Sequence, residues 1–386
     1  MKRLPITAPE FDDAEPAAVR ACLESKWVTQ GPMTRQFEEL FARRHGVAHA
    51  LATTSCTAAL HLATTALGLG PGDEVVVPAF TWVTSAHSAE YVGARAVFAD
   101  VDLRTFNLDP QALRAAITPR TKAVVVVHLF GLAACLDEIL AVARRHSLAV
   151  IEDAACAVGT AYRGRPVGGF GDVGCFSFHP RKIITTGEGG MVTTNDERLA
   201  ESIACLRNHG ASGHPGPGSL PQKPYAMGAF DHLGFNLRLS DIQAAVGVAQ
   251  MAKLDRLLLE RQKIAARYTA LLGELPGIAA PHVPEGCGHT YQSYVIRVVE
   301  GGGARRNAVM DRLAEQGIQT RPGTHAVHRL GYYARKYGLR PEEFPNASAA
   351  EETSITLPIF PGMSEADQDY VVAALHEALT RRTEER

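Results

Sequence analysis

The sequence predicts an α/β protein whose mostly parallel central sheet is sandwiched by helices and followed by a smaller C-terminal α+β domain. Between about residues 47 and 191, short β-branched runs alternate with helical segments, which is typical of such a sheet. Residues 240–275 then read as one long helix with a serine cap, and a helix of this length usually bridges two units. At 386 residues the chain also exceeds the usual size of a single core. We therefore expect a large domain over residues 1–250 and a small one over residues 251–386.

The expected strands are short apolar runs, and the expected helices show apolar residues at three- and four-residue steps. Strands are expected at residues 48–54, 74–79, 94–101, 122–129, 148–155 and 172–178. Helices are expected at residues 57–69 and 136–146, and the elements of the small domain at residues 291–300, 304–317 and 364–379. Residues 210–224 are rich in Gly and Pro, which indicates a surface excursion near a site or a partner. Residues 380–386 read as a solvated tail.

Charge and cysteine content exclude several classes of partner. The 39 basic and 41 acidic residues are spread along the chain, so its charge pattern does not indicate binding to nucleic acid or to an anionic membrane. The first residues lack the apolar region of a secretory signal, and the most apolar run, residues 123–136, is too short to span a bilayer. Seven scattered cysteines without CxxC pairs predict free thiols in a reducing compartment, not disulfides or a zinc site. We expect a cytoplasmic protein with small-molecule partners and no metal.

Two segments place polar groups where a ligand would bind. The strand over residues 148–155 contains Glu152 and Asp153, and ligands of open α/β sheets bind beyond the carboxyl ends of strands. The alternative for Asp153 is a solvated or helix-capping carboxylate. Residues 53–57 join a strand to a helix and carry four hydroxyl groups. Hydroxyls, free N–H groups and the helix dipole together suit a phosphate, whereas ordinary capping needs only one hydroxyl.

Lys182 lies among apolar residues and glycines in the stretch FSFHPRKIITTGEGG, residues 176–190. Most lysines are surface residues, but a desolvated lysine is nucleophilic and suits Schiff-base chemistry with an aldehyde. Pyridoxal 5'-phosphate (PLP) is such an aldehyde, and it requires a lysine, a carboxylate at its ring nitrogen and a phosphate site. Lys182, Asp153 and residues 53–57 offer all three on one α/β domain.

Several segments match a known family. The most specific are IEDAA at 151–155, FSFHPRK at 176–182 and TTGEGGM at 185–191. Further matches are residues 27–32, 55–63, 77–85, 234–245 and 357–364. The chain resembles the DegT/StrS family of PLP-dependent, fold-type-I sugar aminotransferases over nearly its whole length.

The resemblance implies a role for each residue of the cofactor site. Lys182 would bind the cofactor aldehyde and act as general acid and base, and Asp153 would pair with the pyridinium nitrogen. Three residues would hold the phosphate: Cys56, Thr57 and Ser177. Trp82 would lie against a face of the ring, with a core aromatic as the alternative. Asn236 would reach across a homodimer interface to the partner's cofactor, with hydrogen bonding inside its own loop as the alternative.

The same resemblance implies six substrate candidates. They are Thr29, Glu188, Arg238, Arg321, His325 and His328. For Arg238 the alternative is support of its own loop. Metal binding is an alternative for the two histidines, although no third ligand is apparent, and plain surface polarity is another. Cys156 stands where relatives commonly have Gln or His, and Gln292 stands where many have His, so the family's contacts at these two positions are not carried over.

The function implied is a PLP-dependent aminotransferase that converts a nucleotide-linked keto sugar, in the first place a 4-keto-6-deoxy sugar, to the amino sugar. L-Glutamate would be the amino donor. A 3-keto sugar or a keto-inositol is the alternative substrate. A sugar dehydratase of the same architecture has histidine in place of the lysine, and a non-catalytic regulatory protein has no need of both Lys182 and Asp153, so both readings are disfavoured.

Overall fold

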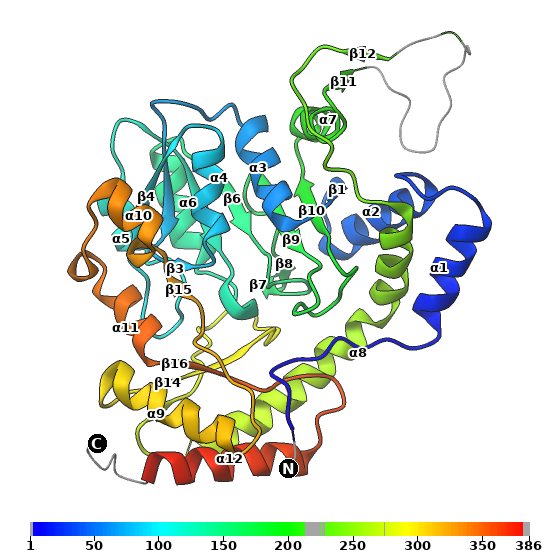
Figure 1. The fold of residues 1–386 in the computed structure, drawn as a ribbon. Coiled ribbons are helices and arrows are strands. Elements are labelled where there is room, and N and C mark those ends of the chain that lie inside the picture. The colour runs from blue at the N-terminus through cyan, green and yellow to red at the C-terminus, as the bar shows by residue number, and fades with distance from the viewer. Residues whose placement is uncertain (1–2, 213–224, 226–227, 274, 381–386) are drawn as a thin grey trace.

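A seven-stranded sheet forms the centre of the molecule (Figure 1). The protein is described by a computed structural model covering residues 3–212, 225, 228–273 and 275–380. The strands are β1 (His49–Thr53), β2 (Glu74–Pro78), β4 (Arg95–Ala99), β5 (Thr121–Val127), β6 (Ala149–Asp153), β9 (Val173–Ser177) and β10 (Gly190–Thr194). They lie in the order β1-β10-β9-β6-β5-β2-β4; β10 is antiparallel to both neighbours, whereas the other neighbouring pairs are parallel. The predicted mostly parallel sheet is confirmed.

All six predicted strands are present with small differences at their ends. Strand β10 was not among them, because its first residue belongs to a glycine-rich run that reads as a turn. It is a strand because β1 and β9 lie on either side of it and exchange backbone hydrogen bonds with it.

Each face of the sheet has its own core, because successive side chains of a strand point to opposite faces. On β5, Ala123 and Val125 lie in one core, and Val124 and Val126 lie in the other. The first core is covered by α3 (Cys56–Ala66), α4 (Thr84–Tyr91) and α7 (Glu197–Leu206). The second is covered by α2 (Pro32–His45), α5 (Pro110–Ala116), α6 (Leu136–Arg145) and the first half of α8 (Asp241–Leu272). The predicted helical layers on both faces are therefore present.

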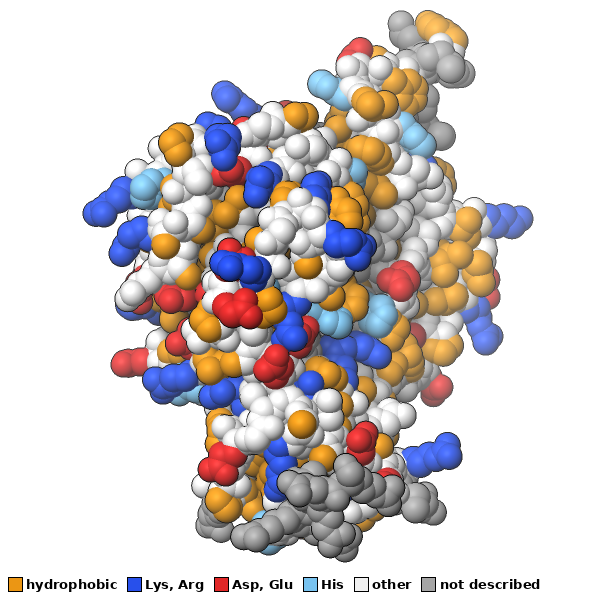
Figure 2. All heavy atoms as spheres, turned by 60° about the vertical axis from the view of Figure 1, so that its left-hand side comes forward, with side chains coloured by type: hydrophobic (Ala, Val, Ile, Leu, Met, Phe, Trp, Pro, Cys, Tyr) orange, Lys and Arg blue, Asp and Glu red, His pale blue; other side chains and the backbone are white. Residues whose placement is uncertain are grey.

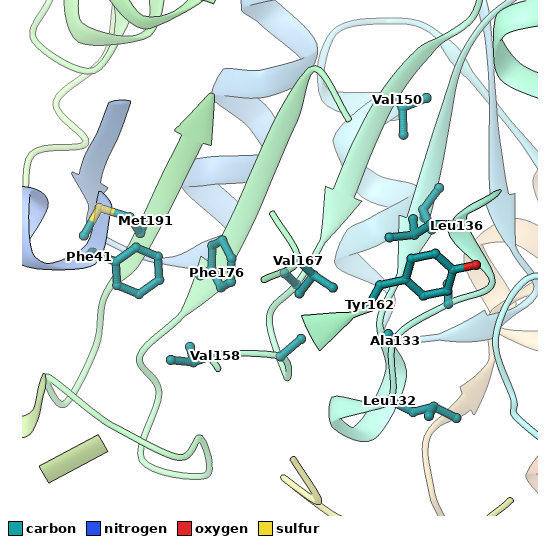
Figure 3. Close-up of a cluster of buried hydrophobic side chains, with 14 of the residues drawn as sticks. Phe41, Leu132, Ala133, Leu136, Val150, Val158, Tyr162, Val167, Phe176 and Met191 are labelled. Atoms are coloured by element: carbon teal, nitrogen blue, oxygen red, sulfur yellow. The ribbon is translucent and has the colours of Figure 1, made fainter. Parts of the chain in front are cut away.

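Figure 3 shows part of the core beneath α2 and α6. Phe41 of α2 lies edge to face with Phe176 of β9, with ring centroids 4.9 Å apart, and Met191 of β10 lies next to Phe41. An edge-to-face pair contributes about 1 kcal/mol beyond the apolar area that it buries. Helix α2 thus packs against both β9 and β10, the two strands whose ends lie at the candidate active site.

Helix α8 is the single long helix that the sequence predicts over residues 240–275, and it contributes to two of the cores. Ser240 accepts a hydrogen bond from the backbone N–H of Gln243, and the Gln243 side chain returns to the Ser240 backbone, which forms a capping box. Ala244 near the start of the helix lies in the α2-side core, whereas Ala265 and Tyr268 near its end lie in a third core. The helix is continuous over 32 residues.

The third core belongs to an α+β unit built around a small antiparallel sheet. Its elements are β13 (Ile278–Ala279), β14 (Tyr294–Val298), β16 (Ser354–Leu357), α9 (Gly302–Glu315) and α12 (Glu365–Thr380). Leu4 also packs in this core, and its backbone pairs with Ile318. The first described residues therefore lie against the C-terminal unit.

A segment between α9 and β16 packs back on the large sheet. Its elements are β15 (His325–Ala326), α10 (Gly331–Tyr337) and α11 (Pro345–Thr353). β15 pairs with β3 (Phe80–Thr81), and Tyr333 and Ala350 lie in the α3-side core. Residues from the C-terminal part of the chain thus belong to a core of the large unit. The two units therefore cannot be separated by cutting the sequence at one position.

The remaining elements are peripheral. They are α1 (Ala14–Glu24), β7 (Ala161–Tyr162), β8 (Arg165–Pro166), β11 (Ala211–Ser212), β12 (Ala229–Phe230) and the 3-10 turns Leu129–Gly131, Val327–Arg329 and Pro341–Glu343. Residues 213–224 of the predicted excursion and residues 381–386 of the predicted tail lie outside the described residues.

The described surface carries charges of both signs. Figure 2 shows basic and acidic side chains interspersed over one face of the molecule. Within the described residues no helix is both long and apolar enough to cross a bilayer. All seven cysteines are free thiols, as predicted.

Asp241, the first residue of α8, is buried and binds the start of α2. Its Oδ1 accepts the N–H groups of Gly31 and Thr34 at 2.8 and 2.9 Å and the Thr34 hydroxyl at 2.7 Å. Its Oδ2 accepts the N–H of Met33 at 3.0 Å. These N–H groups lack partners inside α2 because they lie in its first turn, so the carboxylate satisfies them and also favours the positive end of the helix dipole.

Replacing Asp241 with Ala is expected to lower the free energy of unfolding by about 3 kcal/mol, because the first turn of α2 loses its acceptor. Equilibrium urea unfolding measures this loss. Asp255→Ala is the control on the same helix, since Asp255 makes an exposed ion pair with Arg44, and its removal should cost less than about 1 kcal/mol. Equal losses in the two variants would contradict the capping role.

Candidate active site

Asp153 ends β6 at the carboxyl edge of the parallel strands, and its side chain is only 4% exposed. The Ser85 hydroxyl donates to its Oδ2 at 2.7 Å, and the backbone N–H of Ala155 donates to its Oδ1 at 3.2 Å. The two bonds fix the orientation of the carboxylate. Because the side chain is buried and turns rather than a helix follow it, the solvated and helix-capping alternatives are wrong.

Lys182 lies in the turn between β9 and β10. Its backbone N–H donates to the carbonyl of His179 at 2.8 Å, and its Nζ donates to Sγ of Cys156 at 3.1 Å. β6 and β9 are parallel neighbours with Asp153 opposite Cys175, so the segment after Asp153 and the turn after β9 leave the same edge of the sheet. The structure thus brings the amine and the carboxylate to one site, and Cys156 contacts the lysine there.

The start of α3 faces the same edge. Ser55 caps the helix by accepting the N–H of Ala58 at 3.1 Å, and Cys56 and Thr57 are the first helical residues. Burial raises the pKa of the Cys56 thiol well above its usual range, and the nearby Asp153 carboxylate raises it further. The thiol therefore stays neutral, and a neutral group at a helix N-terminus does not repel a phosphate.

Gly190 allows β10 to pass against the start of α3. A Cβ at this position would lie 2.4 Å from the carbonyl carbon of Ser55 and 2.6 Å from the backbone N of Cys56. Side chains cannot approach backbone so closely, so only glycine fits here. Gly190 is the ladder partner of Ser177, and the structure therefore brings Ser177 to the same place as Cys56.

Trp82 follows β3 and is 53% exposed, so the core-aromatic alternative is wrong. Its ring centroid lies 5.5 Å from that of His325, which is exposed on the paired strand β15. Ser85, three residues after Trp82, donates to Asp153. The exposed indole therefore lies near the Asp153 carboxylate, where it could cover a flat ring.

His328 is fully buried, which contradicts its prediction as a substrate residue. Its Nε2 lies 3.3 Å from the Ser348 hydroxyl, and its ring centroid lies 4.6 Å from that of Phe344. Burial lowers the pKa of His328 to about 4, so the ring is neutral near pH 7. His325 is exposed beside Trp82, so the two histidines do not share a site; the spacing of a His-x-x-His pair could not reveal that one member packs inward.

Arg321 and Arg181 border a hollow next to the lysine turn. The hollow has a volume of 540 Å³ and is also lined by Arg3 and Gln319. Burial lowers the pKa of Arg321, and the positive charge of Arg181 lowers it further. Three arginines and one carboxylate, Asp311, thus line the hollow, and of these the sequence predicted only Arg321.

The other predicted substrate residues lie at the surface or in a loop. Thr29 is exposed between α1 and α2, and the Glu188 side chain is exposed in the turn before β10. Asn236 is exposed on residues 234–240. Arg238, on the same segment, donates to Oδ1 of Asn208 at 2.6 Å and its backbone pairs with Thr53. Arg238 therefore supports its own loop.

Two residues with a role at the site were missed. Ser85 holds Asp153, and no local signal distinguishes it from other serines in a helical run. Gln292 is buried, and its Nε2 donates to the Arg181 carbonyl at 2.8 Å, so it fixes the peptide before Lys182. Both contacts join residues distant in the sequence, and only the folded chain reveals them.

Residues 9–376 match the DegT/DnrJ/EryC1/StrS aminotransferase family. The chain belongs to this family. It is 43% identical over 381 residues to GDP-perosamine synthase of Caulobacter vibrioides, with 98% of this chain and 99% of the relative covered. It is 40% identical over 381 residues to the spore coat polysaccharide biosynthesis protein SpsC of Bacillus subtilis, with 97% and 96% covered.

Solved structures agree with this membership. The aminotransferase TlmJ of Streptoalloteichus hindustanus has a TM-score of 0.89 at 32% identity, with 97% of this chain and 98% of that chain covered. The PLP form of Spr1654 from Streptococcus pneumoniae has a TM-score of 0.91 at 28% identity, with 98% of both chains covered. The protein is a PLP-dependent sugar aminotransferase of the predicted fold.

The residues present fit PLP. They offer the Lys182 amine, the buried Asp153 carboxylate and a helix start whose cradle a Cβ at Gly190 would fill. Lys182 would hold the aldehyde, Asp153 would meet the ring nitrogen, and the start of α3 would hold the phosphate. When bound, PLP supplies an electron sink for the carbon that carries the amino group.

Lys182→Ala is expected to lower the rate of amino transfer by about a thousandfold or more, because the variant loses both the group that binds the aldehyde and the proton carrier. It should also lose the visible absorbance of covalently held cofactor. Lys182→Arg keeps the charge but not the reactive amine and should behave alike, whereas Lys122→Ala removes an exposed lysine and should leave both readouts unchanged. Retained colour in Lys182→Ala would refute the assignment.

Proposed function

We propose that the protein transfers the amino group of L-glutamate to a nucleotide-linked keto sugar, in the first place a 4-keto-6-deoxy sugar. The observation that carries the proposal is the hollow lined by Arg3, Arg181 and Arg321, which adjoins the lysine turn. Guanidinium groups pair with phosphate oxygens, so three of them suit the diphosphate of a nucleotide sugar. The 43% identity to GDP-perosamine synthase supports the same class of substrate.

The electrostatics of the hollow support an anionic substrate. Burial and the Arg181 charge both lower the pKa of Arg321, so the two guanidinium groups repel each other in a partly desolvated place. An anion bound between them removes this repulsion. Because Gln292 holds the Arg181 peptide, the anion would be bound at a defined place relative to the Lys182 amine. In a nucleotide sugar the reacting carbonyl is linked to the diphosphate, so a fixed diphosphate positions that carbonyl relative to the Lys182 amine.

The reaction follows from the chain's own groups. Lys182 would hold the cofactor aldehyde until the amino donor takes its place, and its Nζ, once free, would take the proton from the donor's α-carbon. Asp153, held in place by its two donors, would pair with the ring nitrogen of the cofactor. After the keto acid leaves, Lys182 carries the proton in the opposite direction for the keto sugar. Since the first product leaves before the second substrate binds, double-reciprocal plots should be parallel.

We further propose a homodimer in which Asn236 completes the partner's cofactor site. Asn236 is exposed, and its backbone pairs with Asn208. Arg238 ties the same segment to Asn208, and its backbone pairs with Thr53, just before the phosphate-binding residues. These contacts hold residues 234–240 in place at the edge of the chain's own cofactor site. Asn236 is exposed on this segment and could contact a second copy of the chain.

Mixing two inactive variants tests the dimer. Asn236→Ala and Lys182→Ala homodimers should each be nearly inactive, but mixed dimers contain one site with an intact lysine and an intact partner asparagine. Subunit exchange at equal amounts should therefore restore about a quarter of the wild-type activity, as half of the dimers carry one complete site of two. Absence of any recovery, with exchange verified by native mass spectrometry, would contradict the shared site.

A substrate screen tests the reaction itself. The pyridoxamine form of the protein should regain the visible absorbance of lysine-bound cofactor with a 4-keto-6-deoxy sugar nucleotide, and Arg321→Ala should need about tenfold or more substrate for the same rate. Arg114→Ala, an exposed arginine on α5, is the matched control. Recovery of the absorbance with a 3-keto sugar nucleotide alone would show that the sugar is aminated at C3 and not at C4. Recovery with a keto-inositol alone would refute the nucleotide-sugar proposal.

A further inference from the structure

Two buried hydroxyl groups stand in line behind Asp153. Ser85, in the first turn of α4, donates to Asp153 Oδ2 at 2.7 Å, and the Thr81 hydroxyl lies 3.0 Å from the Ser85 hydroxyl. Ser85 is 0% exposed and Thr81 is 1% exposed, so water does not compete for these bonds. Neither residue belongs to the predicted site.

The direction of the hydrogen bonds follows from the chemistry of the groups. An ionised carboxylate only accepts, so the single proton of Ser85 is used on Asp153. The bond between the two hydroxyls must then run from Thr81 to Ser85. Thr81 is fixed in turn, because its strand pairs with β15 and its carbonyl accepts the Thr324 hydroxyl at 3.1 Å. The orientation of the Ser85 hydroxyl is therefore determined by the packing around it.

The Asp153 carboxylate depends on such a donor. A buried carboxylate has little contact with water, so the donors that the protein provides decide how it is oriented. The two donors given by the structure occupy one site on each oxygen, which leaves acceptor capacity for the protonated ring nitrogen. If the Ser85 donor is removed, the carboxylate loses its only side-chain donor among the described residues and the bond that fixes its rotation.

We propose that Ser85 is a positioning residue for amino transfer: its hydroxyl, oriented by Thr81, fixes the rotation of the Asp153 carboxylate so that a free lone pair is directed at the ring nitrogen of PLP. This role is independent of the sugar that is aminated, so it stands whichever keto compound the substrate screen identifies. It also explains why the first turn of α4 places a hydroxyl, not an apolar residue, at a fully buried position next to β6.

The test uses the holoenzyme loaded with PLP carrying ¹⁵N in its ring. In the wild type the ¹⁵N resonance should report a protonated ring nitrogen. In Ser85→Ala it should move toward the unprotonated value, kcat should fall about ten- to a hundredfold and KM for glutamate should change less. Ser85→Thr keeps the hydroxyl and should restore both the resonance and kcat.

Ser88→Ala is the matched control on the same helix. Ser88 is also 0% exposed, and its hydroxyl donates to the Ser85 carbonyl at 2.8 Å, so its loss perturbs the fold without removing a donor to Asp153. It should leave the ¹⁵N resonance in place. Thr81→Val keeps the shape but removes the donor to Ser85, and it should shift the resonance in the same direction even if Ser85→Ala does not fold. An unchanged resonance in both Ser85→Ala and Thr81→Val, or an equal shift in Ser88→Ala, would overturn the proposal.

Discussion

Two neighbouring carboxylates at the end of β6 are buried on opposite faces of the sheet, and hydrogen bonds hold each of them in place. Glu152 accepts the N–H groups of Gly168, Phe170 and Gly171 at 2.8, 2.7 and 2.7 Å. It also accepts the ring Nε2–H of His128 at 3.0 Å, since Nδ1 of that ring accepts a backbone N–H. Burial alone would raise the pKa of Glu152, but these donors lower it below its usual range. Glu152 thereby fastens the turn before β9 to β6.

Asp153 meets the same physical problem on the other face with a different outcome. Its two donors leave lone pairs unused, so the carboxylate can still accept a hydrogen bond from a ligand. Side chains alternate along a strand, so Glu152 and Asp153 point to opposite faces of the sheet. Glu152 has its hydrogen-bond acceptors occupied and holds the fold together, whereas Asp153 keeps free lone pairs for a ligand. The register between β6 and β9 then sets the Lys182 turn beside it.

The substrate side of the site depends on contacts between distant parts of the chain. Pairing of β3 with β15 brings His325 next to Trp82, while the N-terminal residues and α9 complete the arginine-lined hollow. The cofactor residues lie at the edge of the large sheet, whereas the C-terminal part of the chain supplies the substrate side of the site. The residues on the substrate side can therefore differ while the cofactor chemistry stays the same. This arrangement explains why the cofactor residues carried the family resemblance, whereas the substrate residues were predicted less well.

The sequence by itself determined the layered α/β architecture, the long bridging helix and the cofactor chemistry. These follow from local patterns: apolar periodicity specifies strands and helices, and a strand end, a lysine in a glycine-rich turn and a hydroxyl-rich helix start carry the three groups that PLP requires. Tertiary structure alone decided that Ser85 holds Asp153, that Gln292 holds the Arg181 peptide, and that His328 packs inward while Trp82 stays exposed. Burial and long-range hydrogen bonds depend on which elements pack together, and no local pattern records that choice.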